Sequence, residues 1–62
     1  MEESELLPFL SKEIQAIYRV GRQISIAEGK LEVVAQGFMK IVGRKGTIVI
    51  NEKNLKNIRE IE

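Results

Sequence analysis

The chain has 62 residues, enough for one small domain over residues 1–62. A chain of this length buries only about 60% of its unfolded surface, so we expect a thin core that gains from homo-oligomerisation. It contains no cysteine and no histidine, which excludes disulfide frameworks, thiolate metal sites and the commonest general base, so we expect neither enzyme activity nor a cofactor. Ten basic and nine acidic side chains give a net charge of +1, a balance that does not by itself identify a nucleic-acid-binding protein.

The composition also bears on location. No apolar run approaches the roughly 20 residues of a membrane span. Residues 1–10 are acidic where a signal peptide is basic, and the absence of cysteine fits a reducing compartment. We therefore expect a cytoplasmic protein without a membrane partner or a small-molecule substrate.

The first predicted element is an amphipathic helix over about residues 5–20. Its apolar side chains recur at three- and four-residue steps, with polar side chains between them. Ser4 is a candidate N-cap, and Gly21 suits the left-handed position that follows a helix C-terminus. The apolar positions are Leu6, Leu7, Leu10, Ile14, Ile17 and Tyr18.

Residues 22–36 predict two strands joined by a tight turn. Ile24 and Ile26 alternate with polar residues, and Glu28-Gly29 resembles an Asp-Gly two-residue hairpin turn. A second reading is a helix that begins at a capping box formed by residues 25–28 and continues to about residue 41. Glycines inside that helix would each cost about 1 kcal/mol relative to alanine, which favours strands over residues 26–42 while the helix stays open as an alternative.

Residues 38–51 predict a β-hairpin with Arg44-Lys45 at its tip. β-Branched runs flank Gly43 and Gly46, and glycines around a polar pair indicate a turn. A turn at Arg44-Lys45 fixes which residues of the two strands face each other. It gives two apolar cross-strand pairs on one face and two mixed pairs on the other. The pairs are Ile41 with Ile48 and Met39 with Ile50, then Val42 with Thr47 and Lys40 with Val49.

For the C-terminal segment we favour a short helix, capped by Asn51, over a 3₁₀ turn followed by a last strand. The predicted fold class is therefore α+β. It consists of an N-terminal amphipathic helix, a four-stranded antiparallel meander that can curl into a small barrel, and a short C-terminal helix.

The candidate site is the predicted hairpin tip. Arg44 and Lys45 carry the charges that contact phosphate, and glycine neighbours let a backbone approach closely. The other candidate cations are Lys40, Arg22 and Lys30. We expect a non-enzymatic DNA- or RNA-binding or transcription-regulatory module. The alternative is a structural or protein-interaction subunit that self-associates through its helix or a sheet edge, and the tip is then a solvated turn.

Several families resemble parts of the chain. Gly43-Arg44-Lys45-Gly46 is similar to the GxxG loop of KH domains, although that loop joins two helices and a strand pattern follows here. The layout of a helix before a β-meander resembles the Sm/Hfq RNA-binding rings. The wing region of Crp/Fnr-type winged-helix regulators is similar at Gly37, Phe38, Ile48, Val49, Ile50, Asn51, Leu55 and Ile58. The small β-rich YabP/YqfC sporulation proteins are similar at Ile24, Ile26, Met39, Ile41, Gly46, Ile48, Ile50, Asn54 and Leu55.

Overall fold

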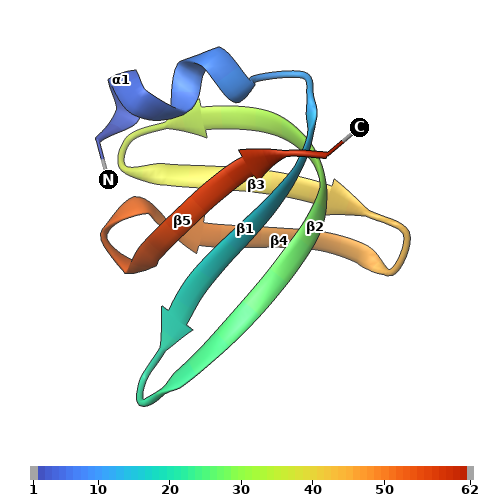
Figure 1. The fold of residues 1–62 in the computed structure, drawn as a ribbon. Helices are drawn as coiled ribbons and strands as arrows, with labels where there is room; N and C mark the ends of the chain where they lie inside the picture. Colours follow the sequence, from blue (N-terminus) through green and yellow to red (C-terminus); the bar gives the residue numbers. More distant parts are fainter. Residues whose placement is uncertain (1, 62) are drawn as a thin grey trace.

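Five antiparallel strands form one sheet in the order β4-β3-β2-β1-β5 (Figure 1). The computed structural model describes residues 2–61. The strands are β1 (Glu13–Val20), β2 (Gln23–Ala35), β3 (Phe38–Gly43), β4 (Gly46–Asn51) and β5 (Leu55–Glu60). A short α1 (Glu3–Leu6) and the 3₁₀ segment η1 (Leu7–Phe9) come first, and the 3₁₀ segment η2 (Glu52–Asn54) joins β4 to β5. No described helix is long and apolar enough to cross a membrane.

The long strand β2 belongs to both halves of the sheet. Its first part pairs with β1, and from Lys30 onward it pairs with β3, with a register shift between Leu31 and Val33. A Cβ atom on Gly29 would lie 2.5 Å from the backbone oxygen of Val42, and one on Gly43 would lie 2.6 Å from the backbone oxygen of Glu28. The two backbones therefore pass too closely for a side chain where β2 leaves β3. Figure 1 shows β1 and β5 crossing β3 and β4 at a wide angle as a result.

The core lies between these two halves and under the N-terminal segment. Leu6 of α1 is fully buried, which stabilises the fold by about 1.5–3 kcal/mol relative to an exposed leucine. The segment after η1 is attached to the bend of β2, because Ser11 N–H donates to Leu31 O at 2.7 Å and Leu31 N–H donates to Lys12 O at 3.1 Å. The other buried apolar residues are Ile14, Ala16, Ala27, Leu31, Met39, Ile41, Ile50, Leu55 and Ile58.

The predicted helix over residues 5–20 is wrong. Helical structure ends at Phe9, and β1 follows. Ile14 and Ala16 are buried while Glu13 and Arg19 are exposed, so the segment alternates with a period of two. The apparent helical spacing arose because the small, fully buried Ala16 did not count as an apolar position.

The predicted turn at Glu28-Gly29 is also wrong, because β2 runs through it. The chain reverses instead at Gly21-Arg22, between paired Val20 and Gln23, and at Gln36-Gly37. Gln36 and Gly37 have φ values of 54° and 81°, as a type I′ hairpin turn requires. The strand interpretation of residues 26–42 is confirmed against the helical alternative, but with different turns.

The hairpin over residues 38–51 has the predicted register, including Ile41 with Ile48 and Lys40 with Val49. The favoured C-terminal helix is wrong, and the second reading is correct: η2 is followed by β5. Asn51 does cap, because its Oδ1 accepts a hydrogen bond from Lys53 N–H at 2.9 Å. The fold is therefore a five-stranded antiparallel β-sheet with a short helical N-terminus, rather than α+β with a four-stranded meander.

Candidate functional site

The tip of the β3–β4 hairpin presents two cations. Gly43 pairs with Gly46, which leaves Arg44 and Lys45 as the exposed residues of the turn. Neither side chain forms an ion pair or a side-chain hydrogen bond with another described residue. Both charges are therefore available to a ligand, and six cross-strand pairs behind them hold the turn in place.

A groove of about 910 Å³ lies beside this tip. It opens where β2 diverges from the hairpin, and Gly29 and Gly43 both line it. The apolar residues that line it include Ala27, Ile41 and Ile48. The two tip cations and Thr47 line the hairpin side.

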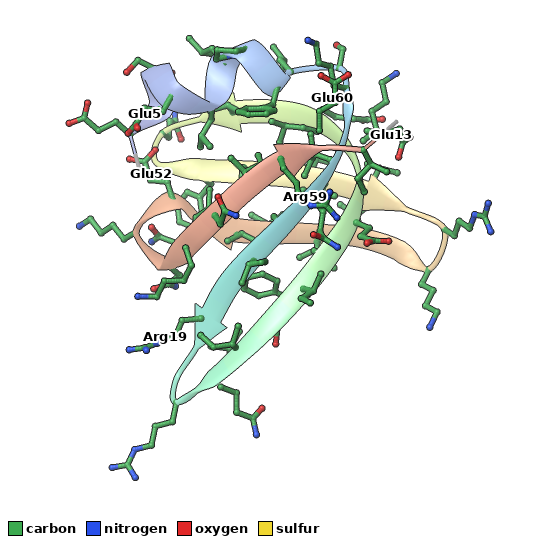
Figure 2. The ribbon with its side chains drawn as sticks, viewed as in Figure 1. Glu5, Glu13, Arg19, Glu52, Arg59 and Glu60 are labelled. Carbon is green, nitrogen blue, oxygen red and sulfur yellow. The ribbon has the colours of Figure 1, made fainter. Side chains whose placement is uncertain are left out.

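The side of the groove opposite the hairpin is acidic. Glu13 of β1 and Glu28 of β2 line it. The Glu28 carboxylate accepts a hydrogen bond from Gln15 Nε2 at 2.8 Å, and Gln15 Oε1 accepts one from Arg59 Nε at 2.9 Å. This polar row crosses β2, β1 and β5, and Figure 2 shows Arg59 lying over that half of the sheet. A polyanion is therefore attracted on the hairpin side and repelled on the other.

The five predicted cations do not form one patch. Lys30 lies near the base of the tip, because it pairs with Val42. Lys40 lies further along β3 and is half-buried between its neighbours on β2 and β4. Arg22 occupies the β1–β2 turn, which Figure 1 shows well apart from the β3–β4 turn. Arg19 marks the same distant end of β1 in Figure 2.

Sequence reasoning missed two features of this site. Thr47 directly follows Gly46, so its position next to the tip could have been read from the hairpin register. The acidic wall, meaning Glu13 and Glu28 on the other side of the groove, could not be predicted, because the sequence pattern puts Glu13 in a helix and Glu28 in a turn. The structure places both on strands that face the hairpin across the groove.

Within residues 2–61 no group of three or more acidic, histidine or cysteine side chains could hold a metal ion. None of the described polar or charged residues is buried. Comparison of the chain with known protein families, with curated proteins and with solved structures finds no match. The family resemblances in the sequence therefore stay predictions.

Proposed function

We propose that this protein is a non-enzymatic module that binds nucleic acid by contacting phosphates with Arg44 and Lys45. The observation that carries the proposal is the pair of exposed, unpaired cations at the apex of a fully registered hairpin. The backbone of this turn is already held in place, so it loses little conformational entropy on binding, and less of the binding free energy is offset by that loss.

The chemistry of the tip suits a phosphodiester backbone. The arginine guanidinium can donate two parallel hydrogen bonds to one phosphate, and the lysine ammonium acts as a compact charge beside it. The Thr47 hydroxyl can add a neutral donor. Contacts of this kind position a nucleic acid without reading its sequence. We therefore expect binding that depends steeply on salt and weakly on sequence.

The test is a titration of wild type and of the double variant Arg44→Ala/Lys45→Ala against duplex and single-stranded oligonucleotides at two salt concentrations. Two lost phosphate contacts reduce the salt slope of log K by about two units on duplex DNA, at roughly 0.9 per contact. The folded state should change little, since exposed turn charges usually contribute under about 0.5 kcal/mol to stability.

The matched control is Lys53→Ala/Lys56→Ala, which removes two exposed cations outside the tip and the same net charge. If the tip is the site, this control keeps its salt slope. Equal losses in both double variants would instead indicate a general charge effect. Absence of binding by wild type would reject the proposal outright.

A further inference from the structure

The outer edge of β4 carries unpaired backbone groups. Glu52 N–H donates to Gly37 O at 2.9 Å. In an antiparallel pair every second residue bonds to the neighbouring strand, so Ile50, Ile48 and Gly46 also direct their backbone groups toward β3. Thr47, Val49 and Asn51 therefore direct their N–H and C=O groups away from β3. β4 is the terminal strand of the sheet, and no other strand covers this edge within the described residues.

The side chains of β4 do nothing to protect this edge. The strand has the sequence GTIVIN, with no charge and no proline. Val49 is 62% exposed on the outer face of the sheet, the face away from the core. Ile48 lies on the inner face with the buried Ile50, yet it is 39% exposed. Exposed, uncharged edges of β-branched residues pair readily with other strands, and natural sheets normally guard them. Apolar surface is thus left open on both faces of the same edge.

We propose that β4 pairs antiparallel with β4 of a second copy of this chain, around a two-fold axis at Val49. This is the one register that pairs all three outward-facing residues inside the strand. Val49 then faces the second copy's Val49, and Thr47 faces the second copy's Asn51, each pair exchanging N–H···O=C bonds. Ile48 faces the second copy's Ile50 on the inner side, so apolar side chains of the two copies pack side by side on both faces of the sheet. The inference does not depend on nucleic-acid binding.

The charges of the two copies are compatible with this joint. β4 is uncharged, so no charge is placed opposite another. Past the ends of β4 the same register sets Lys45 of one copy level with η2 of the other, where Glu52 and Lys53 carry charges of opposite sign. Within the strands, the closest like charges are the two copies of Lys40, each paired with Val49 on the outer face. They lie three strand spacings apart, roughly 14 Å at about 4.8 Å per spacing, which exceeds the Debye length of about 8–10 Å at physiological salt. The two hairpin tips lie at opposite ends of the joint, each next to η2 of the other copy.

The first test is sedimentation equilibrium of wild type and Val49→Lys over a range of concentrations. Wild type should form a dimer, and Val49→Lys should raise the dimer dissociation constant by roughly tenfold or more, because two lysines then meet on the axis. The matched control is Val20→Lys, since Val20 is β-branched, is 58% exposed, and pairs with Gln23 at the far end of β1. It should leave the dissociation constant unchanged.

Charge rescue separates this joint from a folding defect. Val49→Lys and Val49→Glu should each be monomeric alone and form a heterodimer when mixed, since opposite charges on the axis attract. Only a contact between the two copies at residue 49 gives this pattern. Failure of the mixture to associate, while wild type dimerises, would overturn the proposed axis.

Amide hydrogen exchange of wild type gives a third readout that needs no variant. The amides of Thr47, Val49 and Asn51 should become more protected as concentration rises, and the outward amides of β5 should not. A monomer at every concentration overturns the proposal. So does a dimer that protects β5 or the N-terminal segment instead, or assembly that continues beyond the dimer.

Discussion

The two edges of the sheet, β4 and β5, have the same length and opposite surface chemistry. Each has six residues and is paired on one side only. β4 carries no charge, whereas β5 carries Lys56, Arg59 and Glu60, and its pairing with β1 also shifts register next to Tyr18. Charges and irregularities are the features by which natural sheets prevent edge pairing. This contrast is the basis of the proposal that β4, and not β5, takes a partner strand.

The two edges should be equally important to the monomer. Ile50 of β4 is 3% exposed and Ile58 of β5 is 8% exposed. We expect Ile50→Ala and Ile58→Ala each to lower the free energy of unfolding by about 2–5 kcal/mol, because each leaves a cavity in the core. Urea denaturation at a concentration that keeps the protein monomeric measures both. A loss at Ile58 with none at Ile50 would mean that β4 does not pack on the core in solution.

Removing the charges of β5 should abolish the difference between the edges. The variant Lys56→Thr/Arg59→Thr/Glu60→Thr gives β5 an uncharged surface, so we expect assembly to grow past the dimer through two open edges. The variant removes two exposed contacts, Lys12 Nζ with Glu60 Oε1 at 3.4 Å and Arg59 Nε with Gln15 Oε1 at 2.9 Å, so we expect a cost to monomer stability of about 1–2 kcal/mol. Light scattering against concentration measures the growth.

The control for that experiment is Arg19→Thr/Arg22→Thr/Glu32→Thr. It removes two exposed cations and one exposed acid away from both edges, with the same change in net charge. Growth in this control as well would assign the assembly to reduced charge in general and not to the β5 edge.

The smallest effect concerns the acidic wall, which belongs to the half of the sheet that ends in β5. Glu28→Gln removes a negative charge from the groove while keeping an acceptor for Gln15. We expect nucleic-acid affinity to rise by about twofold, the size of one exposed charge interaction of roughly 0.4 kcal/mol. Fluorescence anisotropy at low salt measures it. An unchanged affinity would place the bound phosphate beyond reach of this wall.

The sequence predicted the β3–β4 hairpin because its local signals agree. β-Branched residues lie on both sides of Gly43 and Gly46, and only one register pairs Ile41 with Ile48 on an apolar face. The cations of the tip followed from the same register. Their exposure and their freedom from ion pairs are what such a turn leads one to expect.

The first half of the chain could not be predicted in the same way because tertiary contacts decide it. β1 pairs with β2 on one side and with β5 on the other. Gln15 of β1 accepts a hydrogen bond from Arg59 of β5, which lies far from it along the chain. Glu28-Gly29 has the composition of a turn, but the glycine serves a close crossing with Val42. Local patterns of three- and four-residue spacing carry no information about either contact.

The crossing of β2 and β3 also offers a way to recognise relatives of this chain. Gly29 and Gly43 each face a backbone oxygen of the other strand at a distance that no Cβ atom tolerates. A chain with this bend and loops of the same length therefore needs glycine at both positions, whatever fills its core. Two glycines at this spacing, on either side of a two-residue hairpin turn, are a mark of common architecture that can persist after other sequence similarity is lost.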